Sequence, residues 1–431
     1  MKTNMKRYLL SKHQNESENN EKQEMTSSST DLASHGDVLM EILLRLPIRS
    51  LLRSKCVSKQ WRAAISDHRF SLLRSLKDNP PSGLFLQRIH GNVNKEYDFV
   101  SLDCESLDFK PPFKTLNFEE GSMVLHSCKG LMLCHRLHEY FCNDSKQIVY
   151  YAMYYVYNPT INKYISLPKF EGKGAERRPR GLTLAFDPLK SPYYMVICVI
   201  GFSWSEHLYD IGIYSSESKS WRRFEKPFSS HIDTEFTGGV YWNNAVHWIN
   251  KKGFVLYLKI DDNEGSLDEI SIPVSYNNGW NVKRHCYPLV ESRDCLLFID
   301  TNVPQSSMQF DVYEMDRDYS GWTVKYHVDL NQMTSKFPEM TDATRSVYGV
   351  LRPRQSFVIH CLVLGKREED SFIVLEIPGK AIRYNIMLKT YQQLCELKLC
   401  RPSRLSVGDD GFSKLGRWPG AFLFVESLTY V

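Results

Sequence analysis

Hydrophobic and polar positions divide the chain into three parts of different pattern. In the first, residues 11–34 contain almost no large apolar side chain and are rich in Ser, Asn, Gln, Glu and Lys. Such a segment cannot bury enough surface to offset the entropy lost on ordering. We therefore predict a disordered polar tail over residues 1–33.

The second part, residues 34–77, has apolar side chains at helical spacing. Asp37 is a favourable N-cap for a first helix, and Pro47 ends that helix. Its large apolar positions before the proline are Val38, Leu39, Ile42, Leu43 and Leu46. Ser50 is placed to cap a second helix and Ser58 a third. We predict a small three-helix domain over this range.

The third part, residues 78–431, alternates short runs of Val, Ile, Tyr, Phe and Trp with clusters of Gly, Pro, Asn, Asp and Ser, which is typical of many short strands. A weak repeat runs through it: an aromatic near the end of a strand, a polar turn, and a second aromatic. The repeat is anchored at Phe99, Tyr157, Tyr214, Tyr257, Tyr313 and Tyr384.

Successive anchors are 58, 57, 43, 56 and 71 residues apart, and each spacing suits about one four-stranded blade. The predicted fold class is therefore α+β and multidomain. A small helical domain precedes a mostly antiparallel, propeller-like all-β domain with about six blades. The irregular spacing leaves five or seven blades open.

Composition indicates a globular protein without a nucleic-acid bias. The chain has 431 residues, 42% of them hydrophobic and 24% charged, and a formal net charge of only +4. Its 11 cysteines are an odd number without close pairs, and we find no secretory or membrane-spanning segment. We expect reduced thiols, no membrane partner, and a location in the cytoplasm and/or nucleus.

The first predicted helix carries more apolar surface than one contact requires. Large apolar groups cover well over half of its circumference, whereas a helix buried on one side needs a stripe of roughly 100°. Either the β domain or another protein must cover the second face. This pattern alone leaves two interpretations open, a helical cap on the β domain and a docking surface for a partner.

Candidate metal and catalytic groups do not form a recognisable site. The densest group of potential ligands is His126, Cys128, Cys134, His135, His138 and Cys142. Their spacing does not give the paired short knuckles of a zinc site, so we interpret them as strand cysteines and surface histidines. The 201–205 segment lacks the second glycine of a nucleophile elbow. We expect no metal, no cofactor and no enzymatic activity.

The run from Asp37 to Arg62 resembles the F-box nearly residue for residue, and the match extends to Phe70. The F-box usually has Leu-Pro three and two residues before the Asp, where this chain has Ser34 and His35. The resemblance implies docking on a Skp-type adaptor, and through it on a cullin. The residues that it implies for docking are Val38, Leu39, Ile42, Leu43, Leu46, Pro47, Leu51, Leu52, Val57 and Trp61. Of these, Val57 and Trp61 are expected mainly to pack the helices together.

Several motifs in the third part resemble, in the same order, those of the kelch-like, propeller-forming F-box-associated domain of plant F-box proteins. They are Ser127–Cys134, Tyr157–Thr160, Ala185–Pro188, Ile213–Glu217 with Trp221, and Gly238–Trp242 with His247 and Trp248. The resemblance fades beyond about Leu330, except for a final strand expected at residues 421–425.

Together the resemblances imply a non-catalytic substrate-recognition subunit of a cullin-RING ubiquitin ligase. The β domain would hold an unknown target protein for ubiquitination and degradation. Two alternatives remain open. One is an F-box protein that acts outside the ligase as a protein-binding scaffold, for which the missing Leu-Pro is the ground. The other is a helix-turn-helix nucleic-acid binder, which the apolar surplus of the first helix disfavours.

Overall fold

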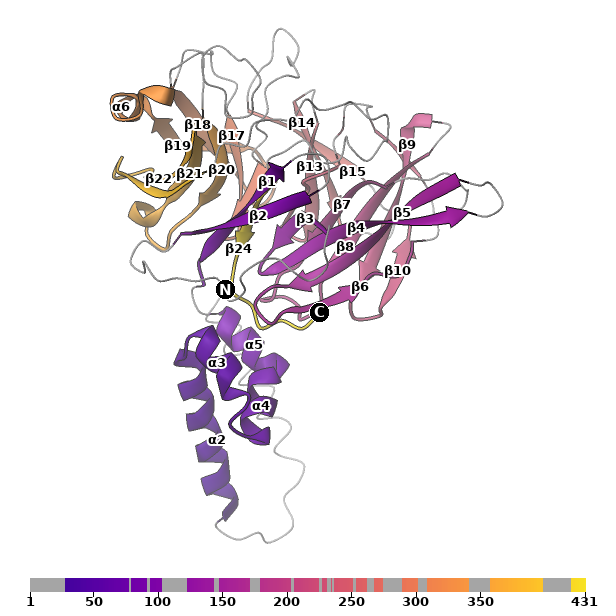
Figure 1. The fold of residues 1–431 in the computed structure, drawn as a ribbon, viewed down its shortest axis with the longest axis vertical. Coiled ribbons are helices and arrows are strands. Elements are labelled where there is room, and N and C mark those ends of the chain that lie inside the picture. The colour runs from indigo at the N-terminus through magenta and orange to yellow at the C-terminus, as the bar shows by residue number, and fades with distance from the viewer. Residues whose placement is uncertain are drawn as a thin grey trace. The chain divides into compact units, whose positions relative to one another are not determined.

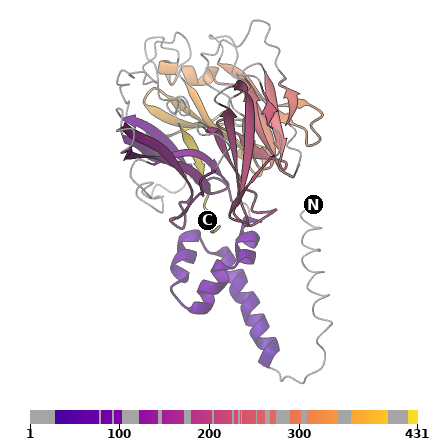
Figure 2. The same cartoon turned by 90° about the vertical axis from the view of Figure 1, so that its right-hand side faces the viewer.

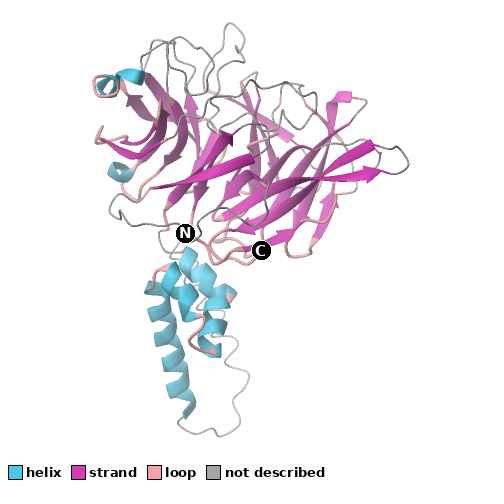
Figure 3. Cartoon of the chain, viewed as in Figure 1, coloured by secondary structure: helices cyan, strands magenta, loops and turns pink. Residues whose placement is uncertain are grey.

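The computed structural model describes most of the chain. The described residues are 28–76, 79–90, 94–102, 122–142, 147–170, 179–202, 205–224, 227–230, 234, 236–250, 253–261, 267–273, 289–300, 308–340, 357–397 and 420–431. The chain divides into two compact units between Ile65 and Ser66. Figure 3 shows that helix, within the described residues, lies almost wholly in the N-terminal part. The exceptions are the short elements α6 (Asn331–Thr334), η1 (Pro338–Met340) and η2 (Glu368–Asp370).

Within the described residues, four helices precede the strands: α2 (Ser28–Arg45), α3 (Ile48–Ser54), α4 (Lys59–Ser66) and α5 (His68–Ser75). The predicted start of the first helix is wrong, because α2 begins upstream of Asp37 and takes in residues 28–33 of the expected tail. The helix passes through Gly36, and no proline stands between Ser28 and Asp37 to end it.

The caps of the next helices are partly as predicted. Ser50 lies inside α3 and does not cap it, because Pro47 occupies the N-cap position with φ −58°. Proline's fixed φ suits the start of a helix, where no N–H is required. Ser58 does cap α4, since its Oγ accepts a hydrogen bond from the Trp61 N–H at 3.1 Å.

The strands form six antiparallel sheets, which we call blades 1 to 6 and describe from the innermost strand outward. Blade 1 is β3 (Met123–Cys128), β4 (Leu131–Cys142), β5 (Gln147–Asn158) and β6 (Lys163–Ser166). Blade 2 is β7 (Pro179–Ala185), β8 (Met195–Phe202), β9 (Ser205–Ser215) and β10 (Ser220–Arg223), with β11 (Phe228–Ser229) beside β9. Blade 3 is β12 (Val240–Trp242), β13 (Ala245–Asn250), β14 (Phe254–Lys259) and β15 (Leu267–Ser271).

Blade 4 is β16 (Leu289–Ser292), β17 (Cys295–Asp300), β18 (Gln309–Met315) and β19 (Trp322–Asp329). Blade 5 is β20 (Val358–Val363), β21 (Phe372–Ile377), β22 (Lys380–Asn385) and β23 (Tyr391–Glu396). Blade 6 combines strands from both ends of the β part, namely β24 (Ala421–Phe424), β1 (Gly83–His90) and β2 (Asn94–Ser101).

The blades close into a ring. The innermost strands contact one another in the cycle β24, β3, β7, β12, β16, β20 and back to β24. Figure 1 shows β24 beside β1, and Figure 2 shows the sheets from the side. The predicted propeller is therefore confirmed, with six blades. The final strand expected near residue 421 is β24, which closes the ring by pairing with β1.

All six repeat anchors lie on the third strand of a blade, from Phe99 in β2 to Tyr384 in β22. The second aromatic of the repeat joins neighbouring blades. The Trp221 indole N–H of blade 2 donates to the Pro168 carbonyl just beyond β6, at 2.7 Å. Trp322 of blade 4 donates in the same way to Ser271 at the end of β15, at 3.0 Å. The repeat in the sequence thus reflects a contact that recurs between blades.

One predicted strand is in fact two. From its apolar residues alone, the run Val240–Ile249 predicts one continuous strand, but Asn243 and Asn244 have φ of +49° and +61° and form a tight turn between β12 and β13. Asn adopts left-handed backbone conformations more readily than most residues, and this turn geometry matches the twist of a hairpin.

Buried apolar side chains fill the spaces between blades, with a cluster at each of the six interfaces. Between blades 6 and 1, for example, the Phe424 ring lies edge-on to Phe85 and Phe99, with centroids 5.7 and 5.9 Å away. Among the described residues, no helix is long and apolar enough to cross a membrane.

Candidate functional site

The helical part presents apolar side chains to solvent. Val38 is 59% exposed and Ile42 is 49% exposed. They are four residues apart on α2, so they lie on the same side of the helix. Val57, between α3 and α4, is 64% exposed. Val38 and Ile42 thus leave apolar surface exposed on α2, and Val57 does so in the connection after α3. We call these three exposed apolar side chains the apolar docking surface.

The structure divides the ten predicted docking residues by burial. Leu43 and Leu51 are fully buried. The half-buried residues are Leu39, Leu46, Leu52 and Trp61, and the exposed ones are Val38, Ile42, Pro47 and Val57. The expectation that Val57 mainly packs the helices is wrong, because it lies in the connection after α3 with its side chain in solvent.

One end of the propeller ring carries a second group of polar contacts. At this end of the ring, tight turns join the first and second strands of blades 1, 3 and 4, and the segment 425–431 leaves β24. We call this end the closure face. Lys129, in the blade 1 turn, forms an ion pair with Glu291 of blade 4, with Nζ and Oε1 2.7 Å apart. Blades 1 and 4 lie opposite each other in the ring, so the ion pair crosses the axis.

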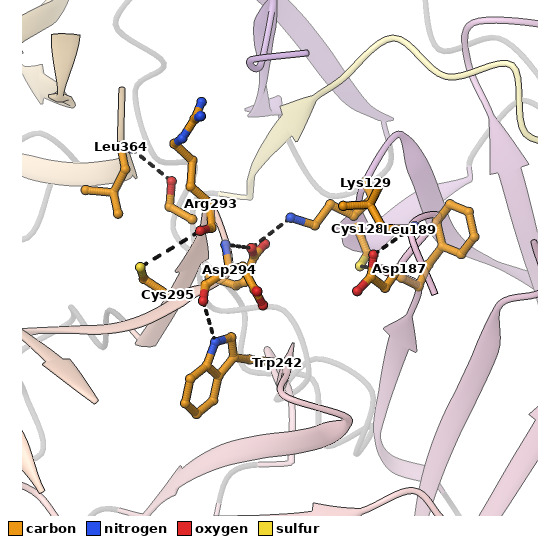
Figure 4. A network of polar contacts seen from close by, with 12 residues as sticks. Cys128, Lys129, Asp187, Leu189, Trp242, Arg293, Asp294, Cys295 and Leu364 are labelled. Atoms are coloured by element: carbon orange, nitrogen blue, oxygen red, sulfur yellow. Dashed lines mark hydrogen bonds and ion pairs between the residues drawn. The ribbon is translucent and has the colours of Figure 1, made fainter. Parts of the chain in front are cut away.

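Further bonds hold this ion pair in place. Figure 4 shows the Lys129 side chain extending from the side of Cys128 and Asp187 toward Asp294. The Asp294 N–H donates to the same Glu291 oxygen at 2.9 Å, and its carbonyl accepts from the Trp242 indole at 2.9 Å. Burial opposes the charge on Lys129, but Glu291 outweighs it and raises the pKa of the lysine above its ordinary value. Lys129 and Glu291 are therefore a stable ion pair at the closure face.

His126, one of the candidate metal ligands, instead links three blades. Its Nδ1 accepts a hydrogen bond from the Leu184 N–H of blade 2 at 3.3 Å, and the ring also bonds to the Gly239 backbone next to blade 3. Burial lowers the pKa of His126 to about 4, so the ring is neutral at neutral pH. Burial also raises the pKa of the Cys128 thiol to about 12, which opposes formation of the thiolate that metal binding requires. No group of three or more His, Cys, Asp or Glu that could hold a metal occurs in the described part of the chain.

Blades 3 and 4 are joined by an aromatic cluster on the closure face. The Tyr319 ring stacks on Tyr257, with centroids 4.5 Å apart and planes 7° apart, and its hydroxyl donates to His247 Nε2 at 3.1 Å. The other nitrogen of His247 donates to the Val240 carbonyl. Tyr319 has φ +63°, a conformation unfavourable for a bulky residue. The stack and the hydrogen bond offset this cost.

The Tyr157–Thr160 motif has a partner far away in the sequence. The Asn158 side chain is fully buried, and its Nδ2 donates to the carbonyls of Ser427 at 3.1 Å and Thr429 at 2.7 Å. Thr160 Oγ1 accepts from the Ser427 N–H at 3.0 Å. The motif therefore binds the segment after β24 to blade 1. The sequence analysis identified this motif but did not predict its role. It also did not predict the ion pair of Lys129, whose partner lies in a distant strand.

Comparisons with known proteins agree with this architecture. Residues 36–73 match the F-box domain family, and residues 101–335, more than half of the chain, match the KIB1-4 beta-propeller family. The F-box protein At5g07610 of Arabidopsis thaliana is 34% identical over 425 residues, covering 94% of each chain. The F-box protein At5g18160 of the same plant is 27% identical over 251 residues, covering 52% of this chain and 58% of its own.

Solved structures are more distant. A chain of the nidogen/laminin complex aligns with 80% of this chain and 99% of its own length, at 8% identity and a TM-score of 0.35. That similarity is too low to bear on the fold, which rests on the sheets described above.

Proposed function

Because this chain belongs to the plant F-box proteins that carry a KIB1-4 β-propeller, we propose that it is the substrate-recognition subunit of a cullin-RING ubiquitin ligase. The F-box docks on a Skp-type adaptor, which connects it to a cullin. The propeller holds a target protein for ubiquitination and degradation. F-box proteins are generally non-catalytic adaptors, and we propose no chemical step for this chain.

The observation that carries the proposal is the apolar docking surface. Val38, Ile42 and Val57 are 59%, 49% and 64% exposed, and all three lie within the segment that matches the F-box. Exposed apolar groups concentrated on a small domain are typical of a protein-binding surface. Leu43 and Leu51, by contrast, are fully buried.

We propose that the propeller is the part of the chain that holds the target protein. Holding a target beside a ubiquitin-loaded enzyme raises its effective concentration without bond chemistry in this chain. We place this activity in the cytoplasm and/or nucleus.

Reconstitution tests the proposal. The chain, a Skp-type adaptor and a cullin are mixed and separated by size-exclusion chromatography. We expect the three to elute as one complex, and the chain to join the cullin only when the adaptor is present. Elution of the chain apart from the adaptor would refute the proposal. Binding of the adaptor without the cullin would instead favour the scaffold alternative, in which Ser34 and His35 replace the usual Leu-Pro.

A further inference from the structure

The segment 425–431 is held on two sides. On one side, blade 1 binds it through Asn158 and Thr160, as described above. Gly130 lets the segment approach closely, because a Cβ there would lie 2.7 Å from the Val425 carbonyl oxygen and 2.5 Å from the Ser427 Cβ. Within the segment, Leu428 is 4% exposed and Val431 packs against the core between blades 1 and 2.

On its other side, the segment contacts the chain that leads from the helices into β1. Glu426 accepts a hydrogen bond on its carbonyl from Asn79 Nδ2 at 2.7 Å. The Tyr430 hydroxyl donates to Ser66 Oγ at 3.3 Å. Burial lowers the pKa of Arg74 in α5, and the negative charge of Glu426 opposes this shift. The two hydrogen bonds therefore flank α5, one at Ser66 before the helix and one at Asn79 after it.

The division of the chain into compact units agrees with these contacts. The F-box match runs to residue 73 and includes most of α5. Yet α5 belongs to the same compact unit as the propeller, because that unit begins at Ser66. One helix of the F-box is thus structurally part of the propeller unit.

We propose that the segment 425–431 is a clamp that fixes α5 to blade 1. The clamp makes the end of the F-box move with the propeller. The consequence of the clamp rests on the proposed function: α5 keeps a fixed orientation relative to the propeller while the propeller holds the target. Asn158 anchors the clamp on the propeller, and Asn79 and Tyr430 form its bonds on the helical side.

Hydrogen–deuterium exchange of the isolated full chain, read by mass spectrometry, tests the clamp. In the Asn79→Ala/Tyr430→Phe variant, amides of α5 should exchange roughly tenfold faster, because two hydrogen bonds that stabilise the docked helix are lost. Peptides from β1 and β5 should be unchanged. Asn158→Ala removes the hydrogen bonds that hold the segment 425–431 on blade 1. It should therefore speed exchange in both 425–431 and α5. Tyr193→Phe, at an exposed tyrosine outside the clamp, is the matched control and should change neither.

Two results would overturn the clamp. One is unchanged exchange of α5 in the Asn79→Ala/Tyr430→Phe variant. The other is faster exchange of 425–431 in Asn158→Ala with α5 still protected. No adaptor or target is present, so the outcome is independent of whether the proposed ligase function holds.

Discussion

Ring closure by β24 predicts that one phenylalanine has a large effect on stability. Phe424 is fully buried, and its ring meets those of Phe85 and Phe99 edge-on. Truncation of a buried Phe to Ala typically costs about 3–5 kcal/mol, which includes the cavity that is left. Each aromatic pair adds about 0.5–1.5 kcal/mol beyond the buried area. We therefore expect Phe424→Ala to lower the free energy of unfolding by about 4 kcal/mol or more.

Urea unfolding followed by tryptophan fluorescence measures this loss. The matched control is Phe422→Ala on the same strand, where the side chain is only half-buried and its ring centroid lies 6.2 Å from that of Tyr97. The control should lose about 1–2 kcal/mol, in proportion to its smaller burial. Equal losses in the two variants, or a loss below about 1 kcal/mol in Phe424→Ala, would refute closure through β24.

Two further predictions concern the contacts between blades. Trp322→Phe removes the indole N–H that donates to the Ser271 carbonyl and should lower the free energy of unfolding by about 1 kcal/mol. The same urea unfolding measures this loss. An unchanged free energy of unfolding would mean that this recurring contact does not stabilise the ring. Acid should also destabilise the propeller, because burial lowers the pKa of His126 and of His247 to about 4 from an ordinary value of 6.5. The folded state binds protons at these histidines less readily than the unfolded state. The free energy of unfolding is therefore highest above pH 6.5 and decreases as the pH falls toward 4, by up to roughly 3 kcal/mol per histidine. Unfolding midpoints that are equal at about pH 7 and about pH 5 would contradict this.

The blade repeat could be predicted because its cause is local. A tyrosine or phenylalanine near the end of the third strand, a polar turn and a following aromatic lie within about ten residues of one another. In blades 2 and 4 the following aromatic is a tryptophan that bonds to the preceding blade, so the same chemistry recurs at the same position. Irregular connections between blades changed the spacing of the anchors but did not remove the pattern.

Long-range contacts could not be predicted in this way. Asn158 meets Ser427, and Lys129 meets Glu291, only because the ring brings distant strands together. No periodic pattern in a single sequence records such a pair. The turn at Asn243 was missed for a different reason: apolar residues on both sides of it resemble one continuous strand, although two adjacent asparagines favour a hairpin turn.

The docking residues were predicted as a set, but their separate roles were not predicted correctly, since Val57 was expected to pack the helices and is exposed. Helical spacing places Val38 and Ile42 on one side of α2, while burial distinguishes them from Leu43 only once the fold is known. A substitution at Leu43 would damage the core of the helical domain and could not separate docking from folding. The exposed members of the set are therefore the proper test of docking.

Affinity for a Skp-type adaptor, measured by isothermal titration calorimetry, tests the central claim most directly. Burying a whole Val or Ile is worth about 1.5–3 kcal/mol, so the 59% and 49% exposed fractions of Val38 and Ile42 correspond to roughly 2–3 kcal/mol together. The Val38→Ala/Ile42→Ala variant should thus bind roughly 30- to 150-fold more weakly, with its helix intact because alanine favours helix. Val324→Ala, which truncates an exposed valine of the propeller, should bind like the unmodified chain. Equal affinity of all three proteins for the adaptor, or no binding by any of them, would contradict the account.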